Sequence, residues 1–287
     1  MQEFRYEIHW PAAGNRPGHH RSLGRGGGYE FKQHVSLWSD PDPRRLDLHA
    51  SLRDPLGEWK VRAFRERRAV TVHVLADLSA SIGFRGERNK LDVLADFVMA
   101  AAYSAYRIGD AFGFIGAAGT LIEDLQVPAG RTKGLGLPLA ERIRRLIPEG
   151  NSIRGLFAAA ERLGRQRALV FLASDFHCEL TELNELLGAL AHHAVVPLVL
   201  WDPAESSVTN RWNFAEVRDL ESGRRRALLL RPSLNLRIGQ ALRERQRELR
   251  SLFLLHGLRP LAFERGFDAD VVTHYFAGGN AWPDVAP

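Results

Sequence analysis

One short stretch of this sequence alternates acidic and hydroxyl side chains. The run "VTVHVLADLSASIGF" (residues 70–84) is mostly apolar up to Asp77, and Ser79 and Ser81 then follow at every second position. Side chains at alternate positions can face one point where the chain bends inward. We therefore expect these three oxygen-bearing side chains to converge, and a converging set of oxygens can bind a cation.

Two further segments offer the same chemistry. The run "ALVFLA" ends in Ser174 and Asp175, and "EGNSIRG" places Ser152 at a predicted helix start. Ligands of open α/β sheets bind outside the carboxyl ends of the strands, so these loops are expected to meet there. Oxygen-only donors suit Mg²⁺, with Mn²⁺ or Ca²⁺ as alternatives. The predicted metal ligands are Asp77, Ser79, Ser81, Ser152 and Asp175.

The segments that carry these residues alternate between apolar runs and amphipathic ones. Strands are predicted over "VTVHVLA", "DAFGFIGA", "LIEDLQV", "RALVFLASD" and "AVVPLVLWD", and helices over "KLDVLADFVMAAAYSAYRIG", "GLPLAERIRRLI", "SIRGLFAAAERLG" and "TELNELLGALAHH". Near-continuous apolar strands are typical of strands buried on both faces. The pattern predicts an α/β fold, with a doubly wound, mostly parallel sheet and helices on both faces.

The two ends of the chain have other patterns. We expect residues 1–68 to form a segment of loop and short strands, and residues 69–287 to form the α/β domain; residues 11–29, rich in Gly, Pro, His and Arg, read as loop. "WNFAEVRDLESGRRRALLL" predicts two strands joined by a turn at Ser222 and Gly223. "LNLRIGQALRERQRELRSLFLLHG" predicts a long helix whose arginine-rich face is solvated.

Composition limits the possible classes of protein. The chain has 287 residues, of which 45% are hydrophobic and 25% charged, as in a folded globular protein. Cys178 is the only cysteine, which excludes an internal disulfide and a multi-cysteine zinc site. No apolar run reaches the roughly 18 residues of a membrane span, and the N-terminus "MQEFRYEIHW" lacks a signal peptide's apolar region. These features predict a cytoplasmic protein.

The net charge of +5 comes almost wholly from arginine. Such a charge favours an acidic partner surface or nucleic acid without choosing between them. The arginines are spread over several segments, and aromatic residues do not alternate with them, so a solvated basic surface is the preferred interpretation. A basic nucleic-acid-binding protein remains an alternative.

The sequence "DLSAS" (residues 77–81) resembles the DxSxS motif of the metal-ion-dependent adhesion site in von Willebrand factor A domains. The resemblance implies that Ser79 and Ser81 contact the metal directly and that Ser152 stands where the family has threonine. It implies that Asp77 and Asp175 act mostly through water. Serine lacks the methyl group that stiffens the threonine rotamer, so a lower metal affinity is expected.

From about Gly18 to Ala277 the chain is similar to one bacterial branch of these domains, the domain of unknown function 58 family. The similarity rests on "HHRSLGRGGGYEF", "RRLDLHAS", "VRAFRERRAV" and "GDAFGFIGAAG". His49 and Leu48 replace the family's usual tryptophan region. The resemblance implies partnership with a MoxR-type AAA+ ATPase and a client protein that offers Asp or Glu to the metal. Its nearest branch is encoded in methanol-oxidation gene clusters and linked to activation of calcium-dependent methanol dehydrogenase.

We find no motif for an enzyme of known type: G-x-S-x-G, the P-loop and H-E-x-x-H are all missing from the sequence. Asp77 could act as the nucleophile of a Mg-dependent phosphatase of the haloacid-dehalogenase type. Such enzymes want an acid where Ser79 stands and a lysine near the site, yet Lys90 opens a predicted helix and Lys133 lies in a loop. The favoured function is a non-catalytic, Mg-dependent protein-binding adapter, and the phosphatase is its alternative.

Overall fold

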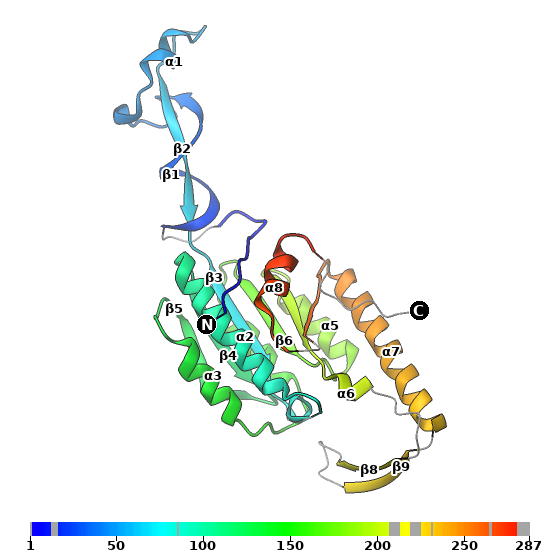
Figure 1. Ribbon diagram of the computed structural model, residues 1–287. Coiled ribbons are helices and arrows are strands. Elements are labelled where there is room, and N and C mark those ends of the chain that lie inside the picture. The colour runs from blue at the N-terminus through cyan, green and yellow to red at the C-terminus, as the bar shows by residue number, and fades with distance from the viewer. Residues whose placement is uncertain are drawn as a thin grey trace. The chain divides into compact units, whose positions relative to one another are not determined.

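The structure is a computed structural model that describes residues 2–12, 17–84, 86–206, 213–218, 225–230, 232–263 and 266–279. The chain divides into two compact units, one of Met1–Glu7 with Thr71–Pro287 and one of Ile8–Val70 (Figure 1). The boundary after Val70 lies close to the one expected between residues 68 and 69. The first residues, in contrast, belong to the larger unit. That residues 1–68 and 69–287 are separate domains stays a prediction.

A six-stranded sheet forms the centre of the larger unit, in the order β10-β7-β6-β3-β4-β5. Neighbouring strands are parallel except for β4 and β5, which are antiparallel. The mostly parallel α/β sheet predicted from the sequence is confirmed. Its strands are β3 (Thr71–Asp77), β4 (Ala111–Ala117), β5 (Leu121–Gly130), β6 (Leu169–Ser174), β7 (Ala194–Leu200) and β10 (Leu261–Phe263).

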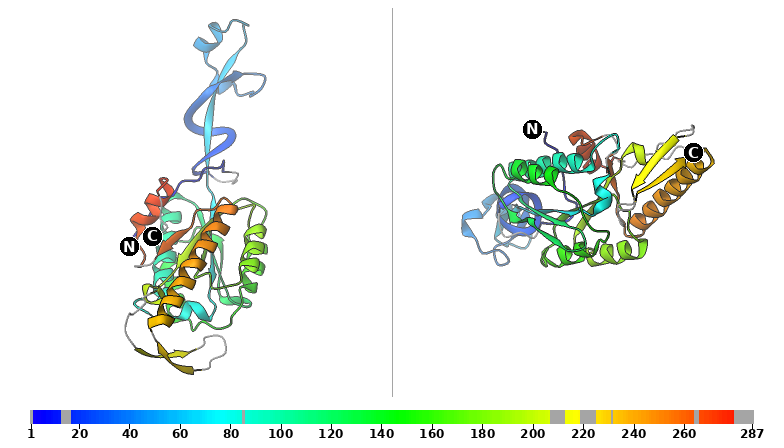
Figure 2. Two further views of the ribbon diagram at one scale, coloured as in Figure 1. Left: turned by 90° about the vertical axis from the view of Figure 1, so that its right-hand side faces the viewer. Right: turned by 90° about the horizontal axis from the view of Figure 1, so that it is seen from below.

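Helices cover both faces of this sheet, as Figure 2 shows. One face carries α2 (Lys90–Ile108), α3 (Gly136–Arg145) and α8 (Ala269–Phe276), and the other carries α4 (Arg154–Glu161), α5 (Leu180–Ala189) and α7 (Pro232–Leu255). Two short elements, η2 (Ala80–Gly83) and α6 (Pro203–Ser206), follow β3 and β7. The sheet is therefore enclosed, which explains its nearly unbroken apolar strands.

The hydrophobic core has one half on each side of the sheet. On the α4, α5 and α7 side, Leu75 and Phe253 belong to a cluster of buried residues. On the α2 side, the ring of Phe97 meets Phe171 edge to face at 5.0 Å and lies parallel to Phe4 at 5.9 Å. The Phe4 backbone N–H also donates to Ser104 Oγ over 3.0 Å. These contacts hold the first residues on the larger unit.

The strand order places a topological switch point between β3 and β6. The chain runs from β3 to β4 on one side of the sheet, and later returns to the other side of β3 as β6, β7 and β10. Loops that leave the carboxyl ends of β3 and β6 therefore diverge to opposite sides and leave a crevice between them. Asp77 ends β3 and Asp175 follows β6, so both acids lie at this crevice.

Helix α2 begins and ends with strong capping residues. The Asn89 side chain accepts from the backbone N–H of Leu91, and Gly109 closes the helix in the left-handed region at φ 78°. Glycine adopts this conformation without steric cost, which is why helices commonly end at it. The helix end predicted at Gly109 is confirmed.

The smaller unit contains an antiparallel pair, β1 (Pro17–Ser36) with β2 (Lys60–Arg68), together with η1 (Pro43–Arg45) and α1 (Leu48–Leu52). The expected loop over residues 11–29 is thus wrong for residues 17–29, which belong to β1. Pairing with the distant β2 supplies backbone hydrogen bonds to a segment of low strand propensity, and several register shifts interrupt it.

Strands β8 (Asn213–Arg218) and β9 (Arg225–Leu230) form a second antiparallel pair, as the sequence predicts. The turn expected at Ser222 and Gly223 lies outside the described residues. Two elements were not predicted from the sequence. They are β10, which has three residues, and α8.

Candidate metal centre

Asp77 is fixed by two hydrogen bonds at the end of β3. Its Oδ1 accepts from the backbone N–H of Ser79 over 3.0 Å, and its Oδ2 accepts from Ser174 Oγ over 2.7 Å. Only 2% of the residue is exposed. The tight turn that follows the strand therefore brings Ser79 back over the Asp77 carboxylate, as the alternating pattern predicts.

Hydroxyl groups connect this turn to the loop after β6. Ser79 Oγ and Ser81 Oγ lie 3.2 Å apart, and Ser81 Oγ donates to Asp175 Oδ1 over 3.1 Å. Asp175 Oδ1 also accepts from the His177 backbone N–H, and Trp201 Nε1 donates to the Asp175 carbonyl oxygen. The structure thus brings together four of the five predicted ligands, Asp77, Ser79, Ser81 and Asp175.

Ser152 is not joined to these four by a hydrogen bond. Its Oγ accepts from the Arg154 backbone N–H over 3.2 Å at the start of α4. The loop before it is tied to the site, because the Ala80 N–H donates to the Gly150 carbonyl over 2.8 Å. Ser152 therefore follows a loop that is tied to the site, but its observed hydrogen bond is to the first residue of α4, and its metal contact stays a prediction.

The structure adds a residue that the sequence analysis missed. The Lys90 ammonium donates to Asp175 Oδ2 over 2.8 Å, and the two side chains are only 2% and 1% exposed. The expectation that Lys90 lies away from the site is therefore wrong. A signal was present in the sequence, because lysine at the first position of a helix opposes the helix dipole and needs a compensating anion.

Ser174, which the sequence places at the end of a predicted strand without making it a predicted ligand, also belongs to the site. Its hydroxyl donates to Asp77 and accepts from the Phe176 backbone N–H over 2.8 Å. Phe176 adopts a positive φ of 56°, which is unusual for a residue with a side chain. The Ser174 hydroxyl thus both orients Asp77 and holds the unusual turn after β6.

The electrostatics of the site favour a bound cation. Burial raises the pKa of Asp77, and the negative charge of Asp175 raises it further, against the lowering effect of its hydrogen bonds. Two buried carboxylates against one ammonium leave net negative charge, and every candidate ligand atom is a carboxylate or hydroxyl oxygen. This donor set fits a hard divalent cation. Among the residues that the structure describes, no three His, Cys, Asp or Glu side chains are grouped as a metal site, so a cation held here would need the serine hydroxyls as ligands.

Cys178 lies beside this site without joining it. Burial raises the pKa of the Cys178 thiol to about 12, with the Asp77 charge as the second cause. The thiol therefore stays protonated at neutral pH and is a poor metal ligand.

Arg245 on α7 reaches the loop that carries Asp175. Its guanidinium donates to the Phe176 carbonyl oxygen over 3.1 Å and also to the carbonyl oxygen of Cys178. The expectation of a fully solvated arginine face on this helix is therefore wrong at Arg245. The helix instead helps to hold the loop after β6.

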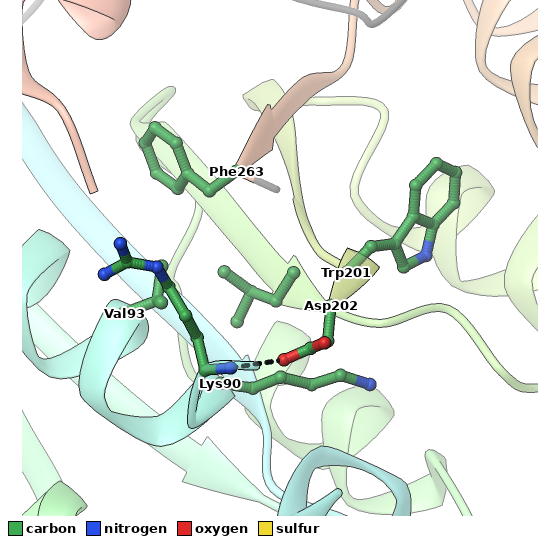
Figure 3. A pocket seen from close by; sticks show the side chains of 7 residues that line it. Lys90, Val93, Trp201, Asp202 and Phe263 are labelled. Carbon is green, nitrogen blue, oxygen red and sulfur yellow. Dashed lines mark hydrogen bonds between the residues drawn. The ribbon is translucent and has the colours of Figure 1, made fainter. Parts of the chain in front are cut away.

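A small pocket lies next to Lys90 (Figure 3). Its lining includes Lys90, Trp201, Asp202 and Phe263, which come from α2, β10 and the end of β7. The Asp202 carboxylate accepts from the backbone N–H groups of Glu87 and Arg88 over 3.0 and 2.7 Å. Asp202 thereby fixes the loop that leads into α2, and so the position of Lys90.

Fold and site together define a von Willebrand factor A-like domain with an oxygen-lined crevice at the carboxyl edge of its sheet. A family model described as "Protein of unknown function DUF58" matches residues 40–248, so the chain belongs to this family. The family membership predicted from the sequence is confirmed. The chain is also 40% identical over 102 residues to the "Uncharacterized protein in moxR 3'region" of Paracoccus denitrificans, spanning 36% of this chain and 97% of that one.

Three solved structures of low sequence identity are similar to this chain over about three quarters of its length. BatB from Bacteroides thetaiotaomicron is 14% identical, with 73% of this chain and 98% of that chain covered and a TM-score of 0.46. An aerotolerance-related membrane protein from Bacteroides fragilis is 13% identical with the same coverage and a TM-score of 0.42. An uncharacterized membrane spanning protein from Vibrio fischeri is 16% identical over 74% of this chain and 96% of that one, with a TM-score of 0.23.

These structures correct the predicted location. The absence of an apolar span suggested a cytoplasmic protein, but two of the matched structures are of proteins described as membrane proteins. Within the described part of the chain, no helix has the length and apolar character to cross a bilayer. A cytoplasmic location is therefore not assigned to this protein.

Proposed function

We propose that this protein is a non-catalytic adapter that binds a partner protein through a divalent cation held at the switch point. The observation that carries the proposal is the hydrogen-bonded series from Asp77 through Ser79 and Ser81 to Asp175. Residues from two strand ends, far apart in the sequence, meet there and offer only oxygen atoms. Such an arrangement fits Mg²⁺, with Mn²⁺ or Ca²⁺ as alternatives.

In this proposal the serines and the aspartates of the site have different roles. Ser79 and Ser81 offer neutral hydroxyl oxygens, which bind a cation without cancelling its charge. Asp77, held by Ser174, fixes the backbone of Ser79, and Asp175 accepts from the hydroxyl of Ser81. A cation bound in this way supplies an open coordination position for a carboxylate of the partner. Binding of an acidic partner side chain then depends on the hydroxyls.

The partner that we propose is a MoxR-type AAA+ ATPase, acting with the adapter on a client enzyme. Support comes from the relative in Paracoccus denitrificans, whose name places it in the region 3' of moxR. The chain's net charge of +5 is compatible with an acidic partner surface, but it does not distinguish such a partner from nucleic acid. The proposal describes the client only as a protein that presents an Asp or Glu side chain.

The test is a binding measurement between this protein and a purified MoxR-type ATPase. Chelation does not isolate the site, because an AAA+ ATPase itself needs Mg²⁺ for its nucleotide. Ser79→Ala is therefore compared with Ser104→Ala, which removes a buried hydroxyl from α2 outside the site. We expect Ser79→Ala to lose most of the affinity and Ser104→Ala to keep it. Equal affinities would contradict the proposal.

One observation favours a second candidate function, the Mg-dependent phosphatase. The lysine that such an enzyme needs is present, because the Lys90 ammonium lies against Asp175. The second acid is still missing, since Ser79 stands in its place, and both Asp77 oxygens accept hydrogen bonds. Incubation with p-nitrophenyl phosphate and Mg²⁺ separates the two candidates. Turnover abolished by Asp77→Asn would favour the phosphatase, and no turnover would favour the adapter.

A further inference from the structure

We propose that Lys90 is a resident counter-cation that competes with the divalent cation for Asp175 and thereby sets the metal affinity of the site. This inference rests on the proposed metal-dependent function. It adds a residue that determines how tightly the site binds metal.

The position of Lys90 requires a specific explanation. It is the first residue of α2, where the helix dipole disfavours a positive charge. It is also only 2% exposed, and removing an ammonium from water is costly unless an anion compensates it. The buried carboxylate of Asp175 provides that compensation at 2.8 Å. Both the helix dipole and burial disfavour a charged lysine at this position. Its presence there therefore points to a specific role for its charge.

The ion pair changes what Asp175 can offer to a metal. Oδ2 is held by Lys90, and Oδ1 is held by Ser81 and by the His177 N–H. Both carboxylate oxygens of Asp175 therefore already accept hydrogen bonds within the protein. Lys90 also reduces the net charge of the Asp77 and Asp175 pair from two negative charges to one. Cation affinity at oxygen sites rises with the number of negative ligands, so Lys90 lowers the affinity.

The pocket beside Lys90 gives the ammonium a second acidic neighbour. Lys90 and Asp202 both line it. Burial raises the pKa of Asp202, but its backbone hydrogen bonds and, to a smaller extent, the charge of Lys90 lower this pKa overall. Figure 3 shows Lys90 and Asp202 together at this pocket. A lysine displaced from Asp175 therefore keeps an anion within its surroundings, which makes exchange between ammonium and metal physically reasonable.

The test is calorimetric titration of Mg²⁺ and Mn²⁺ into the unaltered protein, Lys90→Gln and Lys133→Gln. Gln keeps a donor for Asp175 while removing the charge, and Lys133 is an exposed lysine that serves as the matched control. We expect Lys90→Gln to bind the metal about tenfold more tightly, or better, and Lys133→Gln to bind as the unaltered protein does.

Two other outcomes separate the inference from the function on which it rests. Equal affinities of the unaltered protein and Lys90→Gln would overturn the inference and leave the metal site standing. Binding by none of the three proteins would overturn both.

A second measurement does not depend on the folding of a Lys90 variant. The chain has only four lysines, at positions 32, 60, 90 and 133, so the Lys90 ammonium resonance of ¹⁵N-lysine-labelled protein can be assigned by substituting the other three. Mg²⁺ should shift the Lys90 signal and leave the Lys133 signal in place. A Lys90 signal that stays unmoved while the protein binds Mg²⁺ would overturn the inference.

Discussion

The hydroxyl of Ser174 donates to Oδ2 of Asp77 over 2.7 Å and so joins the carboxyl ends of the adjacent strands β6 and β3. The same hydroxyl accepts from the backbone N–H of Phe176, whose positive φ marks the turn after β6. Through this one side chain, the position of Asp77 depends on the loop that carries Asp175. The Ser174 hydroxyl therefore connects the two halves of the candidate site, one after β3 and one after β6.

Ser174→Ala should destabilise the protein. The change leaves the buried Phe176 N–H without its acceptor and Asp77 without one of its donors, at a cost of about 1 to 3 kcal/mol. Denaturant unfolding measures the difference. Ser39→Ala, which removes an exposed hydroxyl in the smaller unit, should stay within about 0.5 kcal/mol of the unaltered protein. Similar losses for the two variants would contradict the role of Ser174.

Ser152→Thr should raise metal affinity a few-fold. The added methyl group restricts the rotamers of the side chain and restores the residue that the adhesion-site resemblance implies at this position. Calorimetric titration of Mg²⁺ measures the change. If Ser152→Ala and Ser152→Thr both bind as the unaltered protein does, the role of Ser152 is limited to the hydrogen bond that it accepts from the Arg154 N–H.

His73→Leu should reduce the loss of stability in acid. Burial, with a smaller effect of the His193 charge, lowers the pKa of His73 from 6.5 to about 4. As pH falls, the unfolded chain binds this proton first, so stability present above about pH 6.5 is lost toward pH 4, by about 3 kcal/mol. The ring's Nδ1 has no hydrogen-bond partner among the described residues. Leucine therefore removes an acid-sensitive group without breaking a hydrogen bond of that atom.

Denaturant unfolding between pH 7 and pH 4 measures the effect at His73. The variant should show a flatter dependence of unfolding free energy on pH across this window. An unchanged slope would mean that the pKa of His73 is the same in the folded and unfolded chains, contrary to its buried position.

Arg245→Ala should loosen the loop that carries Asp175. It leaves the carbonyl oxygens of Phe176 and Cys178 without their charged donor, and we expect a loss of about 1 to 3 kcal/mol. The matched control is Arg247→Ala, an exposed arginine of the same helix. Thermal unfolding of both variants measures the two losses of stability. An equal loss in both would show that α7 does not hold the loop.

The larger unit could be predicted from the sequence because its elements have strong local patterns. The apolar runs of β3 and β6 and the cap at Gly109 indicate strand and helix without reference to the rest of the chain. Residues 17–29 of β1 could not be predicted as strand, because this glycine-rich part depends on pairing with β2, which lies far along the sequence. Strand β10 has only three residues, too few for a periodic signal.

The candidate site divides in the same way. Asp77, Ser79 and Ser81 follow one strand, so their spacing alone predicts that they converge. Ser174 could be placed at a strand end, but its bond to Asp77 is seen only in the structure. The place of Lys90 in the site depends on its partner across the sheet, although a lysine at a helix start indicates a nearby anion. The position of Ser152 in the motif, in contrast, does not reveal that its hydroxyl accepts from the first backbone N–H of α4.

The most direct test of the central claim is calorimetric titration of Mg²⁺ into the unaltered protein and into Asp77→Asn. Asparagine keeps the shape of Asp77 and its acceptor for the Ser79 N–H, and it removes a buried charge whose raised pKa shows that ionisation is costly, so the variant should fold. We predict saturable binding to the unaltered protein and affinity at least about tenfold weaker in Asp77→Asn. Equal binding by the two proteins, or none by either, would contradict a metal site at the ends of β3 and β6.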